Sequence, residues 1–261
     1  MKTSPLVLAG LLGLAAADPI KRQQATPTPA PKKTIPGHLA YIPWKVDKAP
    51  ADGLQDVTFP ISMKDSIRET GWYFAQVFRF HGKSGGAYIG VQPRPANSKG
   101  PVDHAAFSSF MPGTKSTDPN CSPGADGGPG VSCSVQITGT DDHSYDLRVE
   151  NIGNTTWQGT MVNTVSKVET HIGSWTLPTG AGGIKGNDIG FFEWWPFNDR
   201  SKPPTCDLLK RTTVAFGPPR TSTANAGAGS LGNPYEVYEC KGKTNYKTQK
   251  VGDNVEISLG F

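Results

Sequence analysis

The sequence predicts an all-β protein, an antiparallel β-sandwich or jelly roll. Many short segments carry the apolar–polar alternation that is typical of strands. Turn-forming clusters separate these segments, for example Gly-Asn at 153–154 and Gly-Pro-Pro at 217–219. Helical periodicity is found only weakly, around 62–71, and helices do not alternate with strands. This pattern favours a sandwich over a doubly wound parallel sheet.

The N-terminal region has the features of a secreted protein. A positively charged start, an apolar run and a small-residue cleavage site predict a signal peptide over 1–17. Residues 18–35 contain the dibasic pair Lys21-Arg22, which resembles a processing site of fungal secreted proteins, and a Pro/Thr-rich stretch too poor in apolar residues to fold. We therefore expect a secreted, extracellular protein with one sandwich domain over 36–261. No further apolar stretch approaches the roughly 20 residues that cross a bilayer, so no membrane contact is expected.

The clearest hairpin joins 72–80 to 87–92 across a glycine-rich turn. In its second strand Tyr88, Gly90 and Gln92 share one face, and the opposite face is apolar. Because Gly90 lacks a side chain, this face forms a shallow groove, and Tyr88 and Gln92 become candidate ligand-binding residues. An ordinary solvent-exposed face explains the same pattern equally well.

Further strand segments complete the predicted sandwich. They are expected at 56–63, 105–111, 131–138, 144–151, 155–163, 167–177, 188–195, 212–217, 235–240 and 255–261.

The four cysteines predict two disulfides. We favour the pairs Cys121–Cys133 and Cys206–Cys240, because each joins neighbours in sequence. Closing such a loop is worth about 3 kcal/mol in the chain-entropy view. The spacing typical of zinc sites is absent, so no metal is expected. Asn154 begins an N-glycosylation acceptor, which predicts a surface position.

The stretch 188–197, "DIGFFEWWPF", gathers five large aromatic rings around one acid. On a strand, Glu193 and Trp195 share one face, and the other face is expected to pack in the core. An unpaired carboxylate is costly to bury, so the face of Glu193 is predicted to be outer or to line a groove. Rings that stack on sugars and an acid that binds hydroxyls make Trp195, Phe197 and Glu193 candidate ligand-binding residues. A large core filled by all five rings is the alternative.

Signals for catalysis are weak. No carboxylate pair has the spacing expected of a sandwich-fold glycosidase. His104, His171 and Glu193 are weak catalytic candidates for a polysaccharide-degrading enzyme. The two histidines could form a lyase site with Arg79 or Arg148, although nothing in the sequence brings these residues together. The usual motifs for an activated serine, a zinc-dependent protease or a phosphate-binding loop are absent, and no cofactor is expected. The formal net charge of +4 comes without a basic run, so nucleic acid is not an expected partner.

Several quoted segments together resemble a known group. The segments "GWYFAQVFRFHGKSGGAYIGVQ", "FSSF", "YDLRVEN", "TTWQGTMVN", "IGSWTLP" and "GFFEWW" resemble secreted fungal and actinobacterial proteins related to the domain of unknown function 3472. The resemblance covers about residues 55–220. It implies a concanavalin-like sandwich and a carbohydrate context, and it transfers no functional residue.

Taken together, these features predict a secreted glycan-binding, lectin-like protein that acts on cell-wall polysaccharide. One alternative is a polysaccharide-degrading enzyme, a lyase before a hydrolase. Another is an extracellular effector that binds a host protein. The ligand, the presence of catalysis, bound calcium and the oligomeric state are left open by the sequence.

Overall fold

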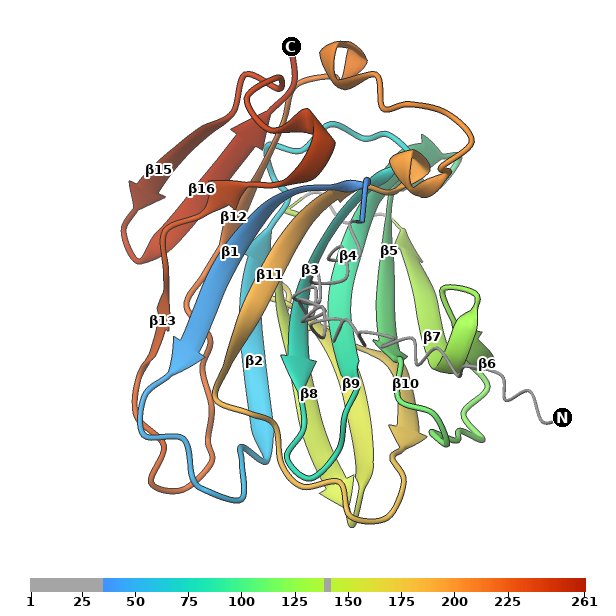
Figure 1. Ribbon diagram of the computed structural model, residues 1–261, viewed down its shortest axis with the longest axis vertical. Helices are drawn as coiled ribbons and strands as arrows, with labels where there is room; N and C mark the ends of the chain where they lie inside the picture. The colour runs from blue at the N-terminus through green and yellow to red at the C-terminus, as the bar shows by residue number, and fades with distance from the viewer. Residues whose placement is uncertain (1–34, 139–141) are drawn as a thin grey trace, which may run out of the picture. The chain divides into compact units, whose positions relative to one another are not determined.

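The computed structural model describes residues 35–138 and 142–261. Two antiparallel sheets pack face to face, which confirms the predicted all-β sandwich (Figure 1). The predicted signal peptide, 1–17, and nearly all of the predicted Pro/Thr-rich segment, 18–35, lie outside the described residues.

The first sheet carries the candidate site on its outer face. Its strands, in spatial order, are β13 (Gly229–Leu231), β1 (His38–Val46), β11 (Asn187–Trp194), β3 (Trp72–Arg79), β4 (Gly86–Asn97), β5 (Gly100–Ser109), β7 (Gly128–Thr138) and β6 (Cys121–Ala125), with β14 (Tyr235–Glu236) also paired to β1.

The second sheet covers the inner face of the first. Its strands, in spatial order, are β10 (Glu169–Thr176), β9 (Thr156–Asn163), β8 (Ser144–Gly153), β2 (Asp56–Ser62), β12 (Thr212–Phe216), β16 (Asn254–Leu259) and β15 (Lys247–Val251). The edge strand β15 is exposed along its whole length.

Short 3-10 turns are the helical elements of the described residues. They are η1 (Trp195–Asn198), η2 (Cys206–Leu208) and η3 (Tyr238–Cys240). The weak helical pattern at 62–71 does not form a helix. This segment is irregular and is held by hydrogen bonds to β12. Ser66 Oγ donates to the Thr213 carbonyl, and the Ile67 amide donates to Thr212 Oγ1.

The core between the sheets is built from alternate residues of the strands. In β3, Trp72, Phe74 and Phe78 point inward and are fully buried. Gln76 lies in the same row, and neither its amide nitrogen nor its amide oxygen has a hydrogen-bond partner in the described residues. The other residues of β3, beginning with Tyr73, face away from the second sheet.

Both predicted disulfides are confirmed. Cys121 and Cys133 are paired residues of the β6–β7 ladder, and their bond fastens that hairpin. The second bond, Cys206–Cys240, joins η2 to η3 across 34 residues of sequence.

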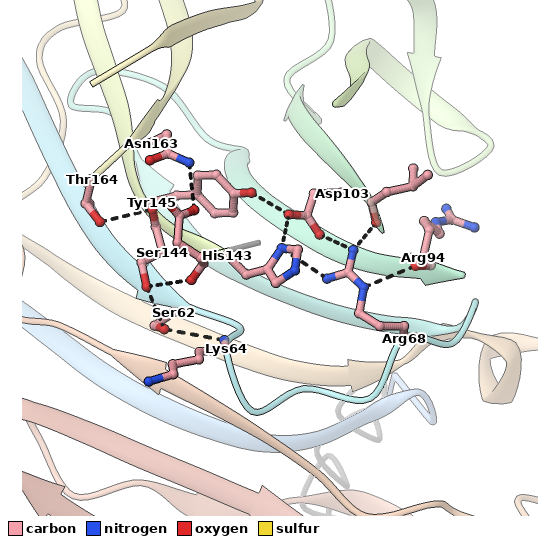
Figure 2. Close-up of polar contacts among 12 residues, drawn as sticks. Ser62, Lys64, Arg68, Arg94, Asp103, His143, Ser144, Tyr145, Asn163 and Thr164 are labelled. Atoms are coloured by element: carbon pink, nitrogen blue, oxygen red, sulfur yellow. Dashed lines mark hydrogen bonds and ion pairs between the residues drawn. The ribbon is translucent and has the colours of Figure 1, made fainter. Parts of the chain in front are cut away.

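A buried polar cluster connects the two sheets at one end (Figure 2). Asp103 of β5 points into the sandwich, and its side chain is fully buried. His143 Nδ1 lies 2.9 Å from Asp103 Oδ2, and the Tyr145 hydroxyl and the Arg68 guanidinium donate to the same carboxylate. Arg68 also donates to the carbonyl oxygen of Arg94. The cluster therefore ties β5 to β8 and to the loop that precedes β3.

Candidate active site

A groove lies on the outer face of the first sheet and has a volume of about 710 Å³. Its walls are mainly aromatic: Tyr41, Tyr73, Tyr88 and Phe191 form a small apolar cluster of their own, separate from the main core. Glu193 lines the groove among these rings. The groove therefore has mainly aromatic walls, and the Glu193 carboxyl lies among them.

Glu193 is almost completely buried, with 5% of its surface exposed. It lies in β11 between Tyr73 of β3 and His38 of β1, its ladder partners on either side. The Asn198 side-chain amide donates to Glu193 Oε1 over 2.7 Å. Burial raises the pKa of Glu193 to about 7, and the hydrogen bond from Asn198 offsets part of the shift. This carboxyl therefore exchanges a proton near neutral pH.

His38 is the nearest basic group to Glu193. Its Nε2 lies 3.7 Å from Glu193 Oε1, and its ring stacks on Phe191 with the ring centres 4.4 Å apart. Its Nδ1 lies 2.8 Å from the Tyr41 hydroxyl, which fixes the orientation of the ring. Burial lowers the pKa of His38 to about 4, so the imidazole is neutral at the pH where Glu193 titrates.

Two tyrosines and an aspartate complete the walls. The rings of Tyr73 and Tyr88 meet edge to face, and burial raises the pKa of both hydroxyls, so both remain protonated donors at neutral pH. Asp126, in the turn between β6 and β7, also lines the groove. Its negative charge adds to the upward shift of the Glu193 pKa.

A carboxyl with these properties suits general acid–base catalysis. Such catalysis is most efficient when the pKa of the group lies near the working pH, and enzymes reach that value by burying a glutamate. The neighbouring amide of Asn198 orients the carboxyl without adding a counter-charge. The candidate active site is therefore the groove around Glu193.

The groove brings together four of the five predicted ligand-binding residues. Glu193, Tyr88 and Gln92 all line the groove. Trp195 stands at its rim, in η1, with 39% of its surface exposed. Phe197 is instead half-buried against the main core and does not line the groove.

The two candidate histidines are not brought together. His104 lies in β5 of the first sheet, and His171 lies in β10 of the second, where its Nε2 is 2.6 Å from Asp118. Since the two candidate histidines lie on different sheets, the structure does not bring them together in one lyase site.

Sequence reasoning missed His38, Tyr41 and Asn198. His38 reaches Glu193 only because β1 pairs with β11, although 155 positions separate the two residues in the chain. No local motif marks such a pair. Asn198 was within reach, since it follows Glu193 by five positions in the turn that Pro196 initiates.

Other predicted features have the following positions. Asn154 is exposed in the turn between β8 and β9, and its glycosylation stays a prediction. In the described ranges, no group of three or more His, Cys, Asp or Glu side chains is arranged to hold a metal ion. None of the helical segments described has the length and apolar character needed to cross a membrane.

Comparisons with known proteins give matches only among solved structures. No protein-family model matches the chain, and no curated protein matches it. The resemblance to the domain of unknown function 3472 stays a prediction.

The matching structures are peptidases. Scytalido-glutamic peptidase with a transition-state analog inhibitor has 11% identity and a TM-score of 0.48, and the same peptidase with a peptide-based analog has 10% and 0.46. SCP-B, a member of the Eqolisin family, in complex with the tripeptide Ala-Ile-His, has 8% and 0.41. Each match covers 87% of this chain and 100% of the other. At these identities the likeness concerns the fold.

The prediction of a glycan-binding protein is wrong, because the matching structures are peptidases. The same finding overturns the alternatives of polysaccharide degradation and of binding a host protein. The physical reason lies in the aromatic stretch, which does not form a platform. Phe191 and Phe192 are buried on opposite faces of β11, and Trp195 is the one exposed ring of the five.

Proposed function

We propose that this protein is a hydrolase that cleaves peptide bonds in its groove, with Glu193 as the general base and then the general acid. The observation that carries the proposal is the buried carboxyl of Glu193, whose pKa is raised to about 7 inside an apolar groove.

The proposed reaction uses one water molecule. The Glu193 carboxylate takes a proton from the water, whose oxygen forms a bond to the carbonyl carbon of the substrate. The C–N bond then breaks, and Glu193 returns the proton to the leaving nitrogen. The Tyr73 hydroxyl lies on the neighbouring strand and stays protonated, so it is the first donor to test for the oxygen that becomes negative.

An extended peptide suits this groove. The apolar side chains of the peptide would pack on the aromatic walls at Tyr41, Tyr88 and Phe191, and the polar groups around Glu193 would face the backbone of the peptide. Peptides are therefore the first substrates to test. His38 is neutral and stacked, so it holds the groove wall without competing for the proton of the water.

We also propose that the protein is secreted and carries a glycan on Asn154. Two disulfides support an oxidising compartment, and the exposed acceptor asparagine is open to modification.

The test is cleavage of a peptide mixture, followed by mass spectrometry, with Glu193→Gln beside the unaltered protein. Glutamine keeps the size and polarity of the side chain but cannot exchange the proton, so we expect a loss of about 10²- to 10⁴-fold in rate. The matched control is Glu150→Gln, which lies on β8 in the second sheet and should keep full activity. Cleavage that persists in Glu193→Gln, or unaltered protein that cleaves no peptide, would overturn the proposal.

A further inference from the structure

Arg94 is a cation without a counter-charge at one end of the groove. It lies in β4, lines the groove and is half-buried. Its Nη2 donates to Gln92 Oε1, and its buried Nε has no hydrogen-bond partner. In the part of the chain that the structure describes, no carboxylate lies within ion-pair distance of its guanidinium, whereas Arg68 is paired with Asp103.

The buried polar cluster around Asp103 does not supply a counter-charge for Arg94. Figure 2 shows that Arg94 meets Arg68 through its carbonyl oxygen, so the contact leaves the Arg94 guanidinium unpaired. The Asp103 carboxylate is occupied by Arg68, His143 and Tyr145.

His104 adds a second unpaired group at the same place. It is the ladder partner of Gln92 on β5, and its buried Nδ1 has no hydrogen-bond partner. Burial lowers the pKa of His104, and the charge of Arg94 lowers it further. An uncompensated cation is costly when half-buried, and an anion bound in the groove would offset the charge of Arg94.

The register relates this end of the groove to Glu193. Glu193 pairs with Tyr73, and the β3–β4 register places Tyr73 beside Gln92, two residues before Arg94. With strands about 4.8 Å apart and about 3.3 Å per residue, the Cα atoms of Glu193 and Arg94 are about 12 Å apart. An extended peptide covers that distance in three to four residues.

We propose that Arg94, with Gln92 and His104, binds a carboxylate of the substrate that lies three to four residues from the bond hydrolysed at Glu193. Arginine suits this role because its planar guanidinium binds a carboxylate through two parallel hydrogen bonds. The carboxylate belongs either to the C-terminus of a peptide or to an Asp or Glu side chain. The inference rests on the proposed function for the position of cleavage, but not for the binding itself.

The binding test separates this inference from catalysis. A short fluorescein-labelled peptide of Leu and Ala is prepared with a free C-terminal carboxylate, with a C-terminal amide, and as amides carrying Glu or Gln at successive positions. Fluorescence anisotropy measures binding to Glu193→Gln, which does not consume the peptide. We expect the carboxylate-bearing peptides to bind about 10- to 100-fold more tightly than their neutral partners, and Arg94→Gln to remove that difference.

The kinetic test uses the same peptides with active protein. Arg94→Gln should raise KM for the carboxylate-bearing peptides by the same factor and leave kcat and the neutral peptides unchanged, and Arg94→Lys should restore part of the loss. Arg148→Gln, on β8 of the second sheet, is the matched control. The preferred carboxylate, terminal or side-chain, identifies the source, and the cut bond should lie three to four residues from it.

Three outcomes would overturn the inference. They are equal binding of charged and neutral peptides, an equal loss on both in Arg94→Gln, and a cut bond at another distance. If the charged peptides bind tightly through Arg94 but the unaltered protein cleaves nothing, the carboxylate site stands and the proposed peptidase activity fails.

Discussion

Glu193 and Asp103 are both buried carboxyl groups of the first sheet, and their pKa values move in opposite directions. Burial raises the pKa of Glu193 to about 7, because one neutral amide is its main hydrogen-bond donor. Burial acts in the same direction on Asp103, but hydrogen bonds from His143 and Tyr145 and the charge of Arg68 lower its pKa on balance. The hydrogen-bond and charge partners, rather than burial, therefore decide whether a carboxyl group holds the fold together or remains free to exchange a proton.

The largest expected effect is the loss of Asp103. Asp103→Ala leaves Arg68 and His143 without their shared acceptor, and removing one partner of such a buried network costs about 3–5 kcal/mol. Chemical denaturation at neutral pH measures this loss. The matched control is Asp146→Ala, whose ion pair with Arg220 is partly exposed to solvent and should cost at most about 1 kcal/mol. Equal losses of stability in the two variants would contradict the stabilising role of the Asp103 cluster.

Acid should reveal the same role in the unaltered protein. Because the pKa of Asp103 is lower in the folded than in the unfolded protein, its contribution to stability is present above the unfolded value of 3.8 and is lost as the pH falls through the folded value. As the pH falls below 4, Asp103→Asn should therefore lose less free energy of unfolding than the unaltered protein does.

An effect of opposite sign is expected at Glu193. Its folded pKa lies above the unfolded value of 4.5, so its contribution to stability is full below 4.5 and is lost as the pH rises through about 7. Glu193→Gln removes the ionised form, so at pH 8 it should stabilise the protein by about 3 kcal/mol and below pH 4 it should change little. Denaturation at the two pH values measures this, with the exposed Glu239→Gln as control. A Glu193→Gln variant that is less stable at pH 8 would contradict the raised pKa.

The smallest expected effect concerns a single hydrogen bond at Glu193. Asn198 donates to Glu193, and that bond lowers the pKa of the carboxyl. Asn198→Ala should therefore raise the midpoint of the pH profile of kcat/KM above 7, by up to about one pH unit. Activity should increase with pH through this midpoint, because the carboxylate is the base. A midpoint that stays at 7 or falls would show that Asn198 does not act on the titrating group.

Much of the fold follows from local sequence. The alternation in 72–80 and 87–92 correctly places Phe74 and Phe78 in the core and Tyr88 and Gln92 on the other face. Both disulfides join the nearest cysteines in the chain, so spacing alone identified them. These features depend on neighbours in sequence, which is the information that periodicity carries.

The candidate site depends on neighbours in space instead. Glu193 was expected to avoid burial, because an unpaired carboxylate is costly to bury, yet it is buried and keeps a proton near neutral pH. The pairing of β1 with β11 brings His38 to it, and the turn of η1 brings Asn198. Neither segment alone predicts which distant strand it pairs with. The prediction of glycan binding, which used the aromatic rings alone, was therefore wrong.

The exposed edge of the second sheet bears on how the protein behaves when concentrated. A free strand edge offers unpaired amides and carbonyls to any other chain, and β15 is such an edge, exposed along its length. Lys247 and Lys250 put two positive charges on its five residues. A second copy that approached this edge with its own β15 would meet like charges. The lysines therefore oppose the edge-to-edge pairing of sheets that leads to fibrous aggregates.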